Sequence, residues 1–206
     1  MVIALANGSS GRHVEGEGAE ALFARALEAV LLSLAKQVAR DGEGATRLLT
    51  VEVTGAPTDD DARQLARGVC RSSLVKCSAF AGQPEWGRVS MAIGQVALQL
   101  GLDLDPSTLT IHAQGTLLYD PSGPKLGHNT ASLRAGLQQT EVHWKVDVGM
   151  GGQGKSTAYG CDLSYDYVRI NADESKQIEV SRSGTVSRNL SLASYSPRLK
   201  HQLLVE

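Results

Sequence analysis

The sequence predicts a layered α/β domain, an α+β arrangement in which helices pack on a sheet. Short apolar or alternating runs, typical of strands, are interspersed with longer segments whose apolar residues recur every three or four positions, as on one face of a helix. The 206 residues can also bury a substantial core, because 42% of them are apolar. These observations favour one main domain of mixed secondary structure.

Six elements are predicted in the first half of the chain. They are strands at residues 2–6, 46–56 and 74–82, and helices at residues 19–40, 58–69 and 85–102. The apolar face of the first helix consists of Phe23, Leu27, Val30, Leu34 and Val38. Gly42 is expected to cap the end of this helix, and Thr58 the start of the next. Three aspartates after Thr58 lie where the helix dipole favours them, which explains the acidic run without a metal ion.

The second half of the chain continues the alternation. Two strands are predicted within residues 103–119, a short helix at 128–139, a strand at 141–148, and a further strand that includes Tyr165, Tyr167, Val168 and Ile170. After Asp173 the composition becomes Ser-rich. We therefore divide the chain into a domain at residues 1–173, a linker or hairpin at 174–195, and the start of a helix at 196–206.

The stretch GMGGQGKS, residues 149–156, matches the nucleotide-binding P-loop pattern at every fixed position. A P-loop needs a strand before it and a helix directly after it, because the helix N-terminus faces the phosphates. The strand at 141–148 is present, but Gly160 and the β-favouring residues that follow argue against a helix. We therefore interpret the glycines as a hairpin turn between two strands.

A second short motif suggests another chemistry. Ser73 and Lys76 have the SxxK spacing of serine acyl-enzymes. Those enzymes carry the pair on a helix, whereas residues 74–82 are predicted as a strand. The motif is therefore set aside.

Charge and composition exclude several classes of partner. The formal net charge is −2 and the pI is about 6.2, so neither nucleic acid nor an anionic membrane is expected as a partner. No run approaches the length of a membrane span, and residues 1–11 lack the basic region of a signal peptide, so a cytoplasmic location is expected. Cys70, Cys77 and Cys161 are expected to be buried free thiols. The histidines lack metal-ligand spacing, so no metal site is predicted.

Three blocks of sequence carry a family resemblance. They are DGEGAT at residues 41–46, SSLVKCSAFAGQPEWGRVSMAIG at 72–94 and AYGCDLSYDYVRINAD at 158–173. In this order they resemble the β-chain of the ornithine acetyltransferase family, also called ArgJ or glutamate N-acetyltransferase. The resemblance covers residues 1–173 and implies a DmpA/ArgJ-like fold of the Ntn acyltransferase type, of which this chain is a fragment.

The resemblance implies an enzyme of arginine biosynthesis that moves an acetyl group from N-acetylornithine to glutamate, releasing ornithine and N-acetylglutamate. In this family a threonine at the start of the self-cleaved β-chain attacks the amide carbonyl, and its own α-amine serves as the base. The resemblance also implies no cofactor, acetyl-CoA as a second donor in some members, and an α2β2 assembly with the family's α-chain. The nucleophilic threonine is expected to be absent here, so no catalytic residue is assigned and the chain alone is expected to be inactive.

Three positions correspond to the family's substrate contacts. Glu43 in DGEGAT matches a substrate-binding glutamate, whose carboxylate can hold an ammonium group by a charge-assisted hydrogen bond. Asn171 matches an asparagine able to donate to and accept from the substrate's polar groups. The third position, usually a threonine, is Lys176 here, a departure that puts this contact in doubt. Residues 196–206 look like the first helix of N-acetylglutamate kinase, which predicts a transferase–kinase fusion.

Three hypotheses follow for the function. The first is a transferase β-chain fragment that bears substrate-side residues, and the second is a non-catalytic binding or assembly module with the same fold. The third is a nucleotide-binding protein that uses Lys155. Acetyl transfer after addition of the missing segment separates the first two, and an ATP-induced thermal shift that depends on Lys155 would support the third.

Overall fold

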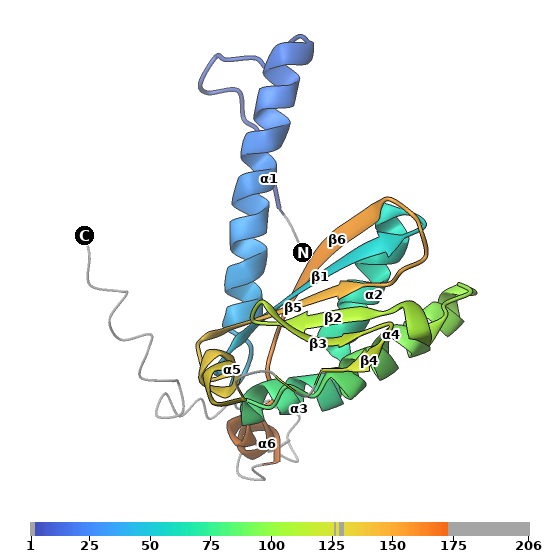
Figure 1. Cartoon of the computed structure of the whole chain (residues 1–206). Helices are drawn as coiled ribbons and strands as arrows, with labels where there is room; N and C mark the ends of the chain where they lie inside the picture. The colour runs from blue at the N-terminus through green and yellow to red at the C-terminus, as the bar shows by residue number, and fades with distance from the viewer. Residues whose placement is uncertain (1–2, 126, 128–129, 173–206) are drawn as a thin grey trace, which may run out of the picture. The chain divides into compact units, whose positions relative to one another are not determined.

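The computed structural model describes residues 3–125, 127 and 130–172, and Figure 1 labels its elements. Two units are distinguished, Met1–Tyr167 and Val168–Glu206, and each is described by itself. The helices are α1 (Glu17–Arg40), α2 (Asp59–Arg71), α3 (Ser73–Ala81), α4 (Trp86–Leu100), α5 (Thr130–Leu137) and α6 (Tyr165–Ala172), with a 3₁₀ turn at Pro106–Thr108. The strands are β1 (Leu48–Ala56), β2 (Thr110–Ala113), β3 (Thr116–Asp120), β4 (Gly123–Pro124), β5 (Glu141–Asp147) and β6 (Gly154–Cys161).

The described strands form a six-stranded sheet in the order β4-β3-β2-β5-β1-β6. β1 and β5 are parallel, with Leu48 opposite Glu141 and Thr54 opposite Asp147, and the other neighbouring pairs are antiparallel. A parallel pair needs a long connection between its strands, and the segment from α2 to α5 supplies it. The mixed sheet confirms the predicted α/β class.

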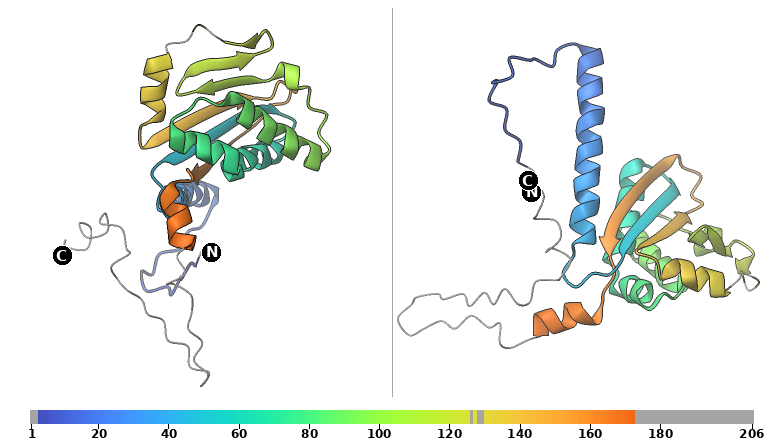
Figure 2. Two further views of the ribbon diagram at one scale, coloured as in Figure 1. Left: turned by 90° about the horizontal axis from the view of Figure 1, so that it is seen from below. Right: turned by 90° about the vertical axis from the view of Figure 1, so that its left-hand side faces the viewer.

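The hydrophobic core lies between the sheet and a layer of helices on one of its faces (Figure 2). Helix α2 packs on β1 and β6, and α4 packs on α2. Strands β1 and β5 contribute fully buried side chains at alternate positions, namely Leu49, Val51, Val53, Val142, Trp144 and Val146. Each such side chain contributes about 1.5–3 kcal/mol to folding by leaving water. The period of two that predicted these strands therefore corresponds to the face they bury.

The opposite face of the sheet is polar. Thr50 and Glu52 of β1 are half-buried there, and His143 and Lys145 of β5 are exposed. Lys145 Nζ lies 3.2 Å from Glu52 Oε1 on the neighbouring strand. This opposite-charge pair stabilises the register of the two strands.

Helix α1 is amphipathic, as predicted, but its apolar side is exposed. It contacts β6 and β1 (Figure 1), and Lys36 Nζ lies 4.9 Å from the centre of the Tyr159 ring. Only Leu31 and Ala39 are half-buried, and the rest of α1 is exposed. Among the helices of the described ranges, none is long and apolar enough to cross a membrane.

Three predicted strands are wrong. Residues 3–6 have no regular secondary structure, residues 73–81 form α3, and residues 165–172 form α6. In α3 the side chain of Ser72 caps the N-terminus by accepting from Val75 N, and Gly82 ends the helix with φ 63°. Ser164 caps α6 in the same way. In α3 and α6 these caps outweigh the strand preference of the apolar, aromatic and β-branched residues, and α3 also buries Val75 and Ala79.

Other predictions at helix ends fare differently. The hydroxyl of Thr58 caps α2 as expected, accepting from Asp61 N at 3.1 Å. Helix α1 ends at Arg40 as expected, but the left-handed glycine is Gly44, with φ 67°, and not Gly42. The predicted helices at 85–102 and 128–139 correspond to α4 and α5. The predicted linker at 174–195 and helix at 196–206 lie outside the described residues.

The glycine-rich segment is not a hairpin. Strands β5 and β6 do not pair, because β1 lies between them in the sheet. The connection therefore crosses the end of β1, and a Cβ on Gly152 would lie 2.0 Å from the Ala56 carbonyl oxygen. A Cβ on Gly154 would lie 2.2 Å from the Thr58 carbonyl oxygen. These two glycines are needed for close approach between backbones. A strand does follow the connection, but it is β6 (Gly154–Cys161) and not the predicted run that includes Tyr165 and Ile170.

Candidate functional site

Glu43 lies in the turn between α1 and β1, and its side chain is exposed. The turn is closed by a backbone hydrogen bond from Ala45 N to Gly42 O, 2.9 Å long. Gly44 follows with φ 67°, a conformation that glycine adopts at little cost. The backbone of this turn therefore presents the Glu43 carboxylate at the surface.

The segment after β6 holds this turn from one side. The Ser164 hydroxyl donates to the Gly44 carbonyl oxygen at 2.5 Å and accepts from Asp166 N and Tyr167 N at 3.1 and 3.3 Å. A Cβ on Gly44 would lie 2.5 Å from Tyr167 N, so the turn and the start of α6 are in close contact. Ser164 is 4% exposed.

Asp162 holds the residues that follow the turn. Its buried carboxylate accepts from Thr46 N at 2.8 Å, from Arg47 N at 3.0 Å and from the Thr46 hydroxyl. Asp162 N donates in return to Arg47 O at 3.2 Å. A buried carboxylate is tolerated when donors saturate its oxygens, and these bonds satisfy that condition.

Arg47 extends this contact toward α3. Its Nη1 atom lies 3.7 Å from Asp162 Oδ2 and donates to Phe80 O at 2.6 Å. The guanidinium lies 5.9 Å from the centre of the Phe80 ring, which meets the Tyr165 ring edge-on at 5.4 Å. The sequence analysis includes Arg47 only within the predicted strand at residues 46–56, and Asp162 and Ser164 only within the block at 158–173. The signal that could have found them is the pair of acid and hydroxyl two residues apart in CDLS.

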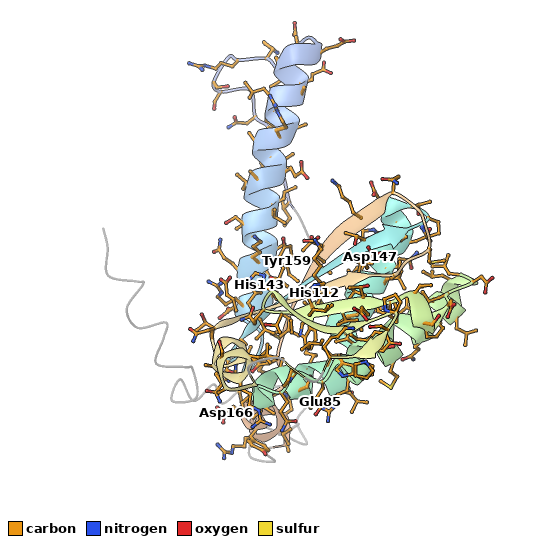
Figure 3. The ribbon with its side chains drawn as sticks, viewed as in Figure 1. Glu85, His112, His143, Asp147, Tyr159 and Asp166 are labelled. Carbon is orange, nitrogen blue, oxygen red and sulfur yellow. The ribbon has the colours of Figure 1, made fainter. Side chains whose placement is uncertain are left out.

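The predicted substrate contacts fall in different places. Glu43 belongs to the first unit, whereas Asn171 is exposed on α6 within the second unit, so their pairing stays a prediction. Lys176 lies outside the described residues. Asp166, in the first turn of α6, is labelled in Figure 3.

The P-loop interpretation fails on geometry. Lys155 is an exposed residue of β6, and its backbone N–H donates to Asp59 Oδ1 at 2.8 Å. A strand follows Gly154 where a P-loop requires a helix N-terminus, so the phosphate-binding arrangement does not form.

The SxxK pair, Ser73 and Lys76, lies on a helix, although the sequence predicts a strand at residues 74–82. Ser73 and Lys76 lie in the first turn of α3. Ser73 is exposed and Lys76 half-buried. The motif is nevertheless not assigned a function, because acyl-enzyme chemistry needs a nucleophile and base in hydrogen-bond contact within a pocket.

The sheet's polar face carries a shallow hollow of about 340 Å³. Its lining residues are Thr50, Glu52, His112, Gly115, His143, Trp144 and Lys145. His112 and His143 come from adjacent strands and are labelled in Figure 3. Its polar groups already have partners within the protein: Lys145 forms an ion pair with Glu52, and His143 Nε2 lies 3.6 Å from Glu141 Oε2. The alternation of apolar residues predicts that β5 is a strand but does not predict the hollow, which depends on the order of the strands in the sheet.

The three cysteines are free, but only one is buried. Cys77 is exposed and Cys161 half-buried, so the prediction of buried thiols holds for Cys70 alone. Burial raises the pKa of the Cys70 thiol to about 12. A thiol in this state is a poor nucleophile at neutral pH.

Comparisons with known proteins place the chain in a family. The ArgJ family model matches residues 1–175. The arginine biosynthesis bifunctional protein ArgJ of Symbiobacterium thermophilum is 43% identical over 173 residues, covering 83% of this chain and 42% of that protein. The glutamate N-acetyltransferase of Methanopyrus kandleri is 40% identical over 175 residues, covering 84% of this chain and 44% of that protein.

A solved structure agrees with this assignment. The crystal structure of the arginine biosynthesis bifunctional protein ArgJ from Bacillus halodurans superposes with a TM-score of 0.76 at 37% identity, covering 84% of this chain and 79% of that chain. The chain spans less than half the length of the two relatives above. With residues 1–175 matched and the fold shared, the chain belongs to the ArgJ family.

Proposed function

We propose that this chain is part of an N-acetyltransferase of arginine biosynthesis that moves an acetyl group from N-acetylornithine to glutamate. Membership of the ArgJ family and the names of the relatives support this proposal. Because the chain spans 42% of the Symbiobacterium protein, the activity is proposed for an assembly that includes the remaining part of such a protein.

Glu43 is proposed to bind the substrate. The observation that carries this role is an exposed carboxylate on a turn whose neighbouring residues are held by the buried side chains of Asp162 and Ser164. A carboxylate held in this way can accept a charge-assisted hydrogen bond from the ammonium group of an amino acid. Asn171 and Lys176 are proposed as further substrate contacts.

The acyl chemistry is proposed to come from residues outside this chain. A threonine hydroxyl attacks the amide carbonyl of N-acetylornithine, ornithine leaves, and the amine of glutamate then takes the acetyl group from the threonine ester. No cofactor is needed for either step, and acetyl-CoA is proposed as an alternative acetyl donor. The assembly is proposed to be an α2β2 complex with the family's α-chain, located in the cytoplasm.

The proposal is tested by acetyl transfer from N-acetylornithine to glutamate in two samples. One contains this chain alone, and the other contains this chain produced together with a family α-chain and the β-chain segment that precedes the matched region in the relatives. We expect activity only in the second sample. Activity in neither sample, with folding confirmed by circular dichroism, would favour a non-catalytic module.

The Glu43→Gln variant tests the substrate contact in the complemented enzyme. Loss of a charge-assisted hydrogen bond costs about 1.5–3 kcal/mol, so KM should rise roughly 10- to 100-fold. A matched control is Glu52→Gln, which neutralises a half-buried glutamate on the polar face of the sheet. Equal KM values for Glu43→Gln and the unchanged enzyme would contradict the proposed role.

A further inference from the structure

Within the described residues, the turn that carries Glu43 is not part of the sheet. Strand β1 begins only at Leu48, so the backbone N–H groups of Thr46 and Arg47 precede the ladder. Both donate to a single side chain, the carboxylate of Asp162. The position of this backbone therefore depends on a residue 116 positions away in the sequence.

The chemistry of Asp162 suits this task. An ionised carboxylate only accepts hydrogen bonds, and here two N–H groups and one hydroxyl converge on it. Arg47 adds a positive charge 3.7 Å from Oδ2, and the Asp162 side chain is fully buried. An asparagine would present an NH₂ group to one of these donors, leaving it unpaired.

Ser164 holds the other end of the turn. Its hydroxyl uses both of its capacities, donating to Gly44 O and accepting from the first N–H groups of α6. Gly44 directly follows Glu43 and packs against the backbone of Tyr167, where a Cβ would lie 2.5 Å from nitrogen. A shift of the Ser164 side chain therefore moves the residue next to Glu43.

We propose that Asp162 and Ser164 are positioning residues, which fix the Gly44–Arg47 backbone so that the Glu43 carboxylate is presented in one orientation to the amino-acid substrate. This inference rests on the substrate role proposed for Glu43. Neither residue touches the substrate. They affect substrate binding only by fixing the turn. If the turn were mobile, the Glu43 carboxylate would have to be ordered when the substrate binds, and the entropy cost would weaken binding.

The test compares Ser164→Ala with a matched control, Ser78→Ala. Ser78 is also buried, and its hydroxyl also donates to a backbone carbonyl, that of Val75 at 2.8 Å, but within α3. Both variants lose a buried hydroxyl and should lose similar stability in urea. Only Ser164→Ala should raise the KM of the complemented enzyme, roughly tenfold, with kcat changed by less than about twofold.

Two further variants sharpen the result. Ser164→Thr keeps a hydroxyl at the same position and should bring KM back toward the unchanged value. Asp162→Asn should raise the hydrogen-exchange rates of the Thr46 and Arg47 amides in the full 206-residue chain, a readout that needs no catalysis. Ser78→Ala should leave these two amides protected.

The outcomes separate this inference from the proposed function. Equal KM values for Ser164→Ala and Ser78→Ala, or faster exchange at Thr46 and Arg47 without a rise in KM, would overturn the positioning role while leaving the Glu43 contact intact. A Glu43→Gln variant with unchanged KM would overturn the substrate role itself. The positioning role would then fail with it, whatever the exchange rates.

Discussion

Glu43 and Asp162 both carry a carboxylate, but their different burial suits them to different roles. Asp162 is 3% exposed and its oxygens accept from Thr46 and Arg47, which leaves it a structural anchor. Glu43 is exposed on the turn that Asp162 holds. A carboxylate that keeps contact with solvent can exchange water for a ligand, so Glu43 is the better candidate for binding.

Cys70 gives a prediction at the same scale. Because burial disfavours the thiolate and raises the pKa to about 12, only roughly one Cys70 side chain in ten thousand is ionised at pH 8. Iodoacetamide should therefore modify the exposed Cys77 rapidly and Cys70 only when the chain unfolds. Peptide mass spectrometry after timed labelling measures both rates.

Two variants serve as controls for this labelling. Cys77→Ser should remove the fast reaction, and Cys70→Ser should leave it in place. Labelling of Cys70 at the rate of Cys77 in the folded chain would show that the site is open to solvent, contrary to its 6% exposure.

Elements whose apolar residues recur at a regular spacing could be predicted from the sequence. Two helices that depend on a capping serine at their N-terminus could not. The helix at 19–40 and the strands at 46–56 and 141–148 were predicted because their apolar residues repeat every three to four or every two positions. Helices α3 and α6 are predicted as strands, because their residues favour strands. The caps from Ser72 and Ser164, which begin the two helices, outweigh this preference. Such caps are weak signals in sequence, since serine is common in loops.

The site was partly predictable for a related reason. Glu43 came from a motif that can be matched letter by letter. The contact of Asp162 with Thr46 spans 116 positions, and no local pattern reports a pairing across that separation. The same limit produced the hairpin error, because only the order of strands in the sheet shows that β1 lies between β5 and β6.

The crossing from β5 to β6 gives a prediction for single glycines. Gly152→Ala would force a Cβ to 2.0 Å from the Ala56 carbonyl oxygen, and we expect a loss of about 1–3 kcal/mol or more in the free energy of unfolding. Gly151→Ala is the matched control, because its Cβ would meet nothing within 4 Å and only the positive φ of 72° is penalised. Urea unfolding measures both variants.

One outcome of this comparison would contradict the prediction. A smaller loss for Gly152→Ala than for Gly151→Ala would contradict the close approach of the two backbones.

Lys155→Ala should change neither stability nor the melting temperature in millimolar ATP, because Lys155 is exposed on a strand. A shift in melting temperature with ATP that Lys155→Ala abolishes would instead restore nucleotide binding.

At the scale of the whole molecule, the chain has an apolar surface that its own described residues leave exposed. Six apolar residues of α1 are at least 44% exposed, namely Leu22, Phe23, Leu27, Val30, Leu34 and Val38. We call this set the α1 stripe. A stripe of this period is normally buried against a partner, and relatives of the family are more than twice as long as the part matched here.

The α1 stripe gives the last prediction. The isolated chain should self-associate through it, since exposed apolar surface is buried most readily against a second copy when nothing else covers it. Leu27→Glu combined with Leu34→Glu should shift the sedimentation coefficient toward that of a monomer, and should also prevent activity from being recovered on complementation. Ser33→Glu combined with Gln37→Glu adds the same charge on exposed polar positions of α1 and should do neither. If the stripe variant complements as well as the unchanged chain, α1 is a solvated helix, and the partner must bind through the polar face of the sheet or the ends of the chain.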